Sequence, residues 1–300
     1  MIRKIDEGAG LLDRLISVTN NVAHIRATLP RGAAHYVRAA DSELHSADNA
    51  KVIQPVPATA GNLESPLPVR RRAGQLERLN TQIANGLTER HGIQTYGFGR
   101  PGLDTGTIRE IVRAMDNMLA KYPHTRILSI EIGDVDGSIA RSFEDRSSQT
   151  SLVGTRIAFS TKYASNPRLL SEDTEQAINR GHFSRRSEGP AYSAIVHEFG
   201  HALTYEGRSA IVDIAETKLF EYYRRKYSNP ESDLEKSYKD WLGKLSGYSF
   251  CKGYFHPIEA LAEAFADVEM NGVRATEPAK VLHEMLVNSA RSEWRKVRLT

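Results

Sequence analysis

Two histidines four residues apart, His197 and His201, carry the clearest chemical signal in this 300-residue chain. On a helix this spacing places both imidazoles on one face, one turn apart. Two neutral imidazoles at that separation can bind one Zn²⁺ ion. Glu198 follows the first histidine, so it would lie beside the metal, where a zinc-bound water needs a base. The three residues therefore predict a metal site that carries its own general base.

The stretch from His197 to His201 matches the H-E-x-x-H pattern of zinc metallopeptidases, although so short a pattern also arises by chance. The alternative is an amphipathic helix with two surface histidines. The neighbouring residues argue against it because they are apolar or small, namely Ala194, Ile195, Val196, Phe199, Ala202 and Leu203. Such a helix is buried on nearly all sides. Two unpaired histidines would be costly there, and a metal ion would satisfy both.

The composition is that of an ordinary soluble globular protein, with 40% hydrophobic and 26% charged residues. The net charge of +3 is too small to indicate a nucleic-acid partner, and we expect none. Cys251 is the only cysteine, so no intrachain disulfide can form and thiolate ligands are not expected. This fits a reducing compartment. The metal ligands should therefore be histidines and carboxylates.

The N-terminal region differs in character from the rest of the chain. Residues 1–28 show a rough helical stripe, whereas residues 29–70 hold five prolines and many small polar residues, which is typical of a linker. We expect an N-terminal helix and linker over residues 1–72 and one domain over residues 73–300, which should fold and bind zinc by itself. No secretory signal or transmembrane helix is expected, which favours the cytoplasm by default or export by another route.

Beyond residue 73 the pattern predicts an α+β fold that is mostly helical with a small sheet. Strands are expected at residues 126–135 and 155–160, and loops at 141–150 and 171–188. One helix should begin after Asp104 or Thr105, and the histidine helix should run from Pro190 to near Gly207. Further helices are expected around residues 76–87, 219–227, 234–245, 257–272 and 277–293.

Two histidines leave a catalytic zinc site one protein ligand short. A metzincin would supply a third histidine, but Thr204 and Gly207 stand where that motif requires Gly and His. Downstream, Glu259, Glu263 and Asp267 follow one another at intervals of four, which places all three acids on one helix face. Like charges at that spacing repel each other unless a positive group compensates them. A metal with its histidines would do so, whereas a solvated acidic surface is the alternative.

The motifs His-Glu-Phe-Gly-His-Ala and Glu-Ala-Leu-Ala-Glu-Ala-Phe together resemble those of zincin-fold gluzincins of the anthrax lethal factor-like type. They also resemble the zincin domains of many phage-encoded and toxin-like bacterial proteins. The resemblance covers roughly residues 155–270 and implies a zincin-like metallopeptidase domain. It implies that Glu259 is the third zinc ligand and that Glu263 orients a ligand histidine, a common arrangement around bound zinc.

The resemblance also implies a tyrosine before the glutamate helix, whose hydroxyl hydrogen-bonds the oxyanion of the transition state. Ser246-Gly247-Tyr248 resembles the S-x-Y stretch that carries it. Extra residues separate Tyr248 from Glu259, so Tyr254 competes for the role, with Tyr248 favoured. Either tyrosine can also be a packing residue. His256 precedes the helix and is expected to start it or to support a ligand.

These expectations add up to a zinc-dependent endopeptidase acting on a protein or peptide, with the strand at 155–160 offering an edge for the substrate backbone. One alternative is a toxin- or effector-type protease with a single protein target. Another is a phage-encoded binding protein that keeps a zincin fold. A third is a structural zinc site, which would need a fourth ligand such as His182 or His256.

Overall fold

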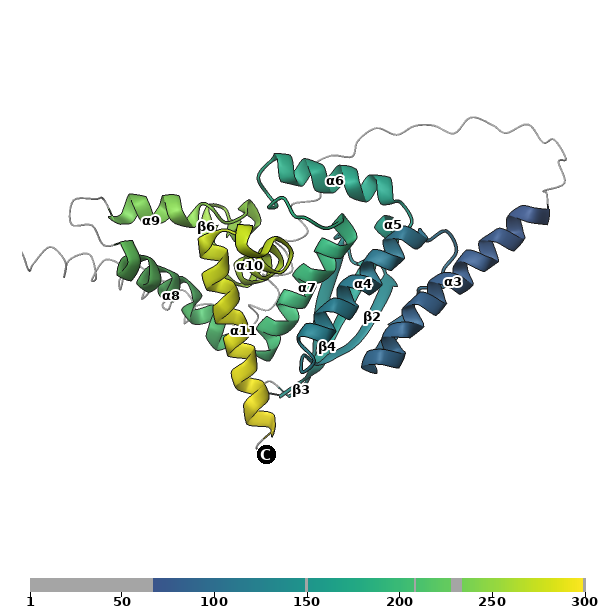
Figure 1. Ribbon diagram of the computed structural model, residues 1–300, viewed down its shortest axis with the longest axis horizontal. Helices are drawn as coiled ribbons and strands as arrows, with labels where there is room; N and C mark the ends of the chain where they lie inside the picture. The colour runs from purple at the N-terminus through teal and green to yellow at the C-terminus, as the bar shows by residue number, and fades with distance from the viewer. Residues whose placement is uncertain (1–66, 149–150, 208, 228–233, 299–300) are drawn as a thin grey trace, which may run out of the picture. The chain divides into compact units, whose positions relative to one another are not determined.

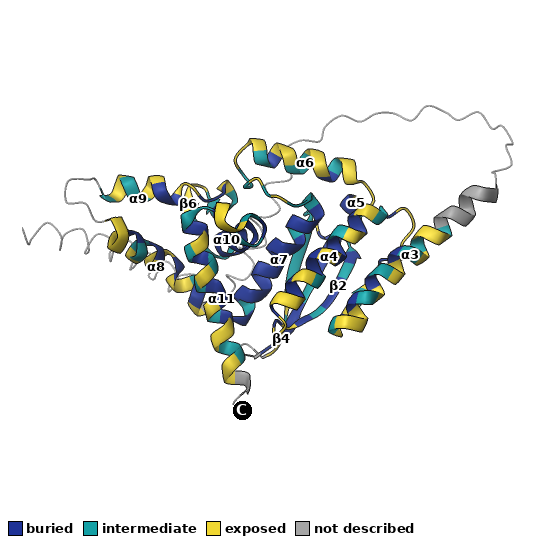
Figure 2. Ribbon diagram, in the orientation of Figure 1, coloured by how far each residue is buried: buried dark blue, intermediate teal, exposed yellow. Residues whose placement is uncertain are grey.

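Two buried helices, α7 (Pro190–Glu206) and α10 (Pro257–Asn271), lie in the middle of the structure (Figure 1). The computed structural model describes residues 67–148, 151–207, 209–227 and 234–298, all within one compact unit, Thr59–Thr300. Fourteen of the seventeen residues of α7 are buried, and the helix is dark along most of its length in Figure 2. The prediction of a histidine helix buried on nearly all sides is therefore confirmed.

The other helices lie around this pair, against the sheet or against one another. They are α3 (Leu67–His91), α4 (Thr105–Lys121), α5 (Thr161–Ala164), α6 (Pro167–Asn179), α8 (Ser209–Tyr227), α9 (Leu234–Leu242) and α11 (Glu277–Arg298), with 3-10 turns η2 (Gly247–Ser249) and η3 (Gly272–Arg274). With its small sheets the chain is α+β and mostly helical, as predicted. The expected helix at residues 1–28 and the linker up to residue 66 lie outside the described residues. The rest of that linker is helical, since α3 begins at Leu67.

A four-stranded sheet packs against α7 through its strands β3 (Ala140–Ser148) and β4 (Ser151–Ser160). The strand order is β1-β2-β4-β3, with β1 (Gln94–Tyr96) and β2 (Ile127–Gly133) completing the sheet. The β1–β2 and β2–β4 pairs are parallel, and β3–β4 is antiparallel. Both predicted strands exist, but β4 lies inside the sheet. The expectation that residues 155–160 offer a free edge is therefore wrong, and the edge strand on that side is β3.

The prediction of a loop at residues 141–150 is also wrong, because most of this segment belongs to β3. This strand has little apolar alternation, and its order comes from backbone pairing with β4. Arg156 of β4 also reaches across to Asp145 of β3, with Nε 3.0 Å from Oδ2. Charged side chains are common on the edge strands of natural sheets. The polar sequence of β3 resembles that of a loop.

The predicted loop at residues 171–188 is wrong in its first half, where α6 extends to Asn179. Asn166 caps this helix by accepting a hydrogen bond from the Leu169 amide, and Pro167 occupies its first turn. Only Leu170 and Ala177 are buried, so the helix gives a weak apolar pattern. The remaining residues, 180–189, connect α6 to α7 without regular structure and become important at the site.

The bounds of α4, α7 and α10 agree with the local sequence signals. Pro190 occupies the first turn of α7, and Gly207 is its C-cap. Asp104 caps α4 through the Thr107 amide, which decides between the two predicted capping residues. In α10, Pro257 lies in the first turn and Gly272 is the C-cap. None of the described helices has the length and apolar character needed to cross a membrane.

Close approach of α7 and α10 depends on one glycine. A Cβ atom at Gly200 would lie 2.9 Å from Cα of Ala262, a backbone atom that cannot move aside cheaply. Phe199 and Phe265, the neighbours of this contact, stack with ring centroids 6.1 Å apart. The glycine therefore lets the two helices meet at the level of the histidines, which brings the acids of α10 within reach of α7.

An ion pair between the buried carboxylate of Glu206 and the exposed side chain of Arg126 fixes the far end of α7 to the sheet. The carboxylate of Glu206, only 2% exposed, accepts hydrogen bonds from Nε and Nη2 of Arg126 and from the Arg126 backbone amide. The same guanidinium donates to the carbonyl of Leu152 in β4. These bonds link the end of α7 to the start of β2, so they restrict rotation of α7 against the sheet.

Candidate metal centre

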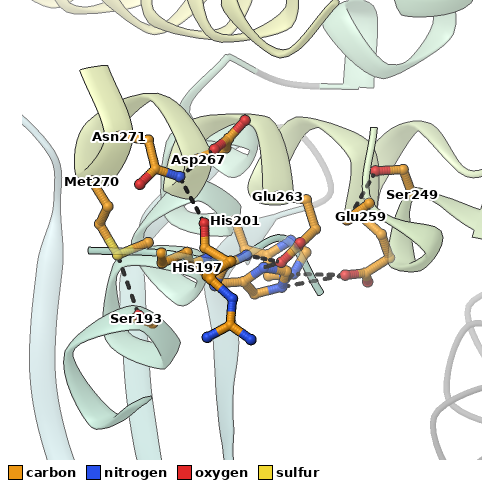
Figure 3. A network of polar contacts seen from close by, with 12 residues as sticks. Ser193, His197, His201, Ser249, Glu259, Glu263, Asp267, Met270 and Asn271 are labelled. Carbon is orange, nitrogen blue, oxygen red and sulfur yellow. Dashed lines mark hydrogen bonds and ion pairs between the residues drawn. The ribbon is translucent and has the colours of Figure 1, made fainter. Parts of the chain in front are cut away.

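The two histidines of α7 lie side by side, as their spacing predicts. Both are buried, and their ring centroids are 4.8 Å apart. The Nε2 atoms of His197 and His201 are 3.1 Å apart, so the two rings present the same nitrogen to one point. Figure 3 shows the rings next to each other beneath α10. One helix therefore supplies two converging imidazole nitrogens.

The third group at this point comes from the first turn of α10. The Oε2 atom of Glu259 lies 3.3 Å from Nε2 of His197 and 3.4 Å from Nε2 of His201 (Figure 3). Ligands held at about 2.0–2.1 Å from one tetrahedral zinc ion lie about 3.3 Å from one another. The three atoms thus form a triangle of the size that such an ion requires. His197, His201 and Glu259 make a buried cluster that can bind a metal ion.

The chemistry of the three atoms fits a cation. Oε2 of Glu259 is buried and receives no well-formed hydrogen bond from the described residues. Burial alone raises the pKa of Glu259, but the charge of His201 and the nearby His197 hold it well below its ordinary value. An orphaned carboxylate oxygen facing two imidazole nitrogens is costly unless positive charge lies between them. The arrangement therefore favours a metal ion at this point.

Glu263, one turn after Glu259, contacts the other side of the same histidine. Its Oε1 atom lies 2.8 Å from Nδ1 of His197. A carboxylate can only accept here, so Nδ1 carries a proton, and a metal ion at Nε2 would take the place of the proton there. Burial lowers the pKa of His197, but Glu259 and Glu263 outweigh burial and raise it to about 10. The site thus stabilises positive charge where the three ligand atoms meet.

Asp267 shares a helix face with these two glutamates but lies away from the centre. Its Oδ1 atom accepts a hydrogen bond of 2.7 Å from Asn271, and its Oδ2 atom accepts one of 3.3 Å from the Thr276 amide. The side chain therefore stabilises the end of α10 and the turn into α11. Of the three acids that the sequence placed on one face, the structure brings two to the histidines.

Glu198, the residue predicted to be a general base, lies next to the histidine pair. It is buried on α7, directly after His197, and lies close enough for its charge to raise the pKa of that histidine. It is not one of the three residues whose ligand atoms converge. Glu198 is thus beside the candidate metal point without being a ligand in the cluster.

Tyr248 lies at the centre, and Tyr254 does not. The Tyr248 ring is half-buried in η2 with its centroid 5.7 Å from that of His197, whereas Tyr254 is 79% exposed. Between them the extra residues form a hairpin of β5 (Phe250–Cys251) and β6 (Tyr254–Phe255). Its turn residues, Lys252 and Gly253, both have positive φ, as a tight two-residue turn requires. The hairpin accounts for the extra length and carries Tyr254 outward.

The two other candidate histidines lie outside the cluster. Nδ1 of His256 accepts a hydrogen bond from the Glu259 amide, so His256 caps the first turn of α10. Of its two expected roles, this is the one at the start of the helix. The His182 ring packs edge-on against Tyr248 at 4.8 Å. Among the described residues the cluster therefore has three members and no fourth His, Cys, Asp or Glu.

Two further residues near the centre, Tyr205 and Arg186, were not predicted from the sequence. Tyr205 lies one turn after His201, with its ring nearly parallel to that imidazole and its hydroxyl 3.3 Å from Oγ of Ser142 in β3. Burial raises the pKa of Tyr205 to about 12, so the hydroxyl stays protonated. Its position four residues after His201 places it on the same face of the helix, and this spacing could have identified it. Arg186, the second residue, contacts Glu263 from the segment 180–189, and no local pattern marked it.

Comparisons with known protein families, curated proteins and solved structures found no match to this chain. Functional interpretation therefore depends on the site itself. Its defining features are two imidazole nitrogens and one carboxylate oxygen converging on a point, with a second glutamate behind one histidine and a third beside it.

Proposed function

We propose that this protein is a zinc-dependent endopeptidase with a zincin-like, gluzincin-type centre. The observation that carries the proposal is the triangle of ligand atoms from His197, His201 and Glu259, with sides of 3.1–3.4 Å. Its size suits tetrahedral zinc, and its histidine and carboxylate donors suit that ion. Glu198 beside the triangle favours a hydrolase over a purely structural site, because a structural site has no use for a base.

The proposed chemistry divides between the metal and the chain. Bound zinc would lower the pKa of a coordinated water and polarise the substrate carbonyl. Glu198 would accept a proton from the attacking water and later transfer it to the leaving amine. The hydroxyl of Tyr248, on the His197 side of the centre, donates a hydrogen bond to the carbonyl oxygen as negative charge develops on it. Glu263 holds the His197 ring in its ligand orientation throughout.

An open coordination position favours catalysis over a structural role. Structural zinc sites are closed by four protein ligands, whereas catalytic ones use three and leave a position for water. The cluster has three members among the described residues. Glu259 also keeps 19% of its side chain exposed, roughly twice the fraction of either histidine, so the solvent side of the triangle lies toward the carboxylate.

The free edge of β3 is the proposed support for an extended substrate. Within the described sheet β3 pairs only with β4, and its Ser142 contacts Tyr205 one helical turn from His201. An extended peptide that pairs with an edge strand is held by main-chain hydrogen bonds and therefore with little dependence on sequence. Such pairing would lay a peptide backbone alongside the ligand histidines.

Zinc content and peptide cleavage test this proposal together. The purified protein should hold about one Zn²⁺ per chain, because three protein ligands suffice for an open site. Elemental analysis after refolding with excess zinc measures the stoichiometry, and a proteome-derived peptide mixture measures cleavage. A protein that holds no zinc after this refolding would contradict the proposal. Cleavage of a single protein among many would instead indicate a protease dedicated to one target.

Replacing Tyr248 by phenylalanine should lower kcat about 10²–10³-fold, the usual effect of removing one oxyanion donor. Zinc content should stay unchanged, since the hydroxyl is not a ligand. The matched control is Tyr254→Phe, which removes the same group from an exposed ring and should leave kcat as in the wild type. Equal effects of the two substitutions on kcat would remove Tyr248 from the mechanism.

A further inference from the structure

A largely buried arginine lies behind the candidate metal centre. Arg186 belongs to the segment 180–189 between α6 and α7, and its side chain is only 9% exposed. Burial of a charged side chain is costly unless the charge is paired. The partner is Glu263, itself 3% exposed, whose Oε1 atom accepts a hydrogen bond from Nη2 of Arg186. Phe183 shields the pair, because the guanidinium carbon lies 5.8 Å from the centre of its ring.

The same carboxylate oxygen joins the arginine to a candidate ligand. Oε1 of Glu263 accepts both from Nη2 of Arg186 and from Nδ1 of His197. The three side chains thus form a chain of contacts, from Arg186 through Glu263 to the His197 ring. Since Glu263 cannot move toward one donor without leaving the other, the arginine helps to fix the carboxylate that orients the imidazole.

Stability of the fold does not account for this pair. The contact uses one atom of each group, while Nε of Arg186 and Oε2 of Glu263 are buried without hydrogen-bond partners. Buried ion pairs with incomplete hydrogen bonding often add nothing to stability compared with apolar residues of similar size. The pair is better explained by the charge of the neighbouring site.

The charges around the centre require such a cation. Glu198, Glu259 and Glu263 bring three negative charges within or next to the cluster. Among the described residues, Arg186 is the only lysine or arginine that forms an ion pair with any of them. One divalent metal ion and one guanidinium balance three carboxylates. Without the arginine, one buried carboxylate would remain uncompensated when the metal is bound.

The segment that carries Arg186 is held in place by other bonds. Oγ of Ser187 donates to the carbonyl of Met270 at 2.6 Å, and Nδ2 of Asn271 donates to the carbonyl of Arg185 at 3.0 Å. The amide of Tyr248 donates to the carbonyl of His182 at 2.9 Å. The backbone is therefore anchored at the end of α10 and at η2, independently of the Arg186 side chain. Substituting that side chain should leave the segment where it is.

We propose that Arg186 is a positioning residue that holds the Glu263 carboxylate against His197 and thereby sets the affinity of the centre for zinc. The inference rests on the metal centre of the proposed function. It requires that Arg186 act through Glu263, because no ligand atom of the cluster belongs to Arg186.

The first test is the zinc affinity of Arg186→Gln, measured by competition with a chelator. The expected loss is about 10–100-fold, the range for removing a partner behind a metal ligand. Arg185→Gln is the matched control, since the neighbouring arginine is 67% exposed and pairs with Glu175 instead. Thermal unfolding of the metal-free proteins, followed by circular dichroism, separates a loss of affinity from a loss of fold.

The second test asks whether Arg186 acts through Glu263. In Glu263→Gln the side chain can still accept from Nδ1 of His197 but carries no charge that needs a cation. Adding Arg186→Gln to that variant should change zinc affinity little, so the two substitutions should be strongly non-additive. The double variant holds no unpaired buried charge, which keeps the comparison possible even if Arg186→Gln alone fails to fold.

The outcomes separate this inference from the proposed function. A wild-type protein that binds no zinc contradicts both. Wild-type binding with equal affinity in Arg186→Gln contradicts only the role of Arg186. A double variant that binds zinc much more weakly than Glu263→Gln also overturns it, since Arg186 would then act by a route other than Glu263.

Discussion

Replacing Glu198 by glutamine is expected to reduce peptide hydrolysis about 10²–10⁴-fold, the usual contribution of a general base. Glutamine has nearly the same shape but cannot accept the proton of the water at neutral pH. Because Glu198 is not one of the three converging residues, the variant should keep about one zinc per chain. Turnover of a cleaved peptide and elemental analysis of the same sample provide the two measurements.

This combination of lost turnover and retained metal is what separates a base from a ligand. Tyr205→Phe provides a useful comparison, because it removes a hydroxyl near Glu198 while keeping the ring beside His201. Hydrolysis at the wild-type rate in Glu198→Gln would show that another group activates the water. Loss of zinc from this variant would place Glu198 among the ligands.

Replacing Glu259 by alanine is expected to remove both zinc and activity. The substitution deletes one of three ligand atoms, so the loss of affinity should exceed the roughly 10–100-fold loss caused by removing a residue behind a ligand. Its first-turn position in α10 is secured by the His256 cap and by Pro257, which do not depend on the carboxylate, so the fold should survive. Chelator competition measures the affinity, and circular dichroism of the metal-free protein checks the fold.

Asp267→Asn is the matched control for this result. Asp267 lies on the same helix and the same face, but its contacts are with Asn271 and the Thr276 amide. The control should keep zinc and activity and lose at most some stability at the end of α10. Equal zinc affinity in Glu259→Ala and the wild type would exclude Glu259 as the third ligand. The zinc would then bind without the triangle of His197, His201 and Glu259.

Local chemistry explains why the histidine helix could be predicted with its bounds. Pro190 favours a first turn and Gly207 favours a helix end, and both effects depend on one residue and its immediate neighbours. The apolar residues between them repeat with helical periodicity whatever they pack against. The same reasoning located α10 between Pro257 and Gly272.

The prediction of loops from local sequence failed where a segment takes its secondary structure from the elements it packs against. The strand β3 is polar and takes its conformation from β4, and α6 buries only Leu170 and Ala177. Neither element has the apolar repeat that a sequence pattern detects. The position of β4 inside the sheet was likewise hidden, because the order of strands depends on how distant segments pack.

The sequence alone determined which side chains of α7 can act together, since residues four apart on a helix must share a face. It also placed Glu259, Glu263 and Asp267 on one face of a second helix. The tertiary structure decided how the helices meet: the contact at Gly200 brings Glu259 and Glu263 to the histidines and leaves Asp267 at the turn into α11. It also brought Tyr248 inward and placed Arg186 behind Glu263. These contacts join segments far apart in the chain, and no periodicity of either segment encodes the distance between them.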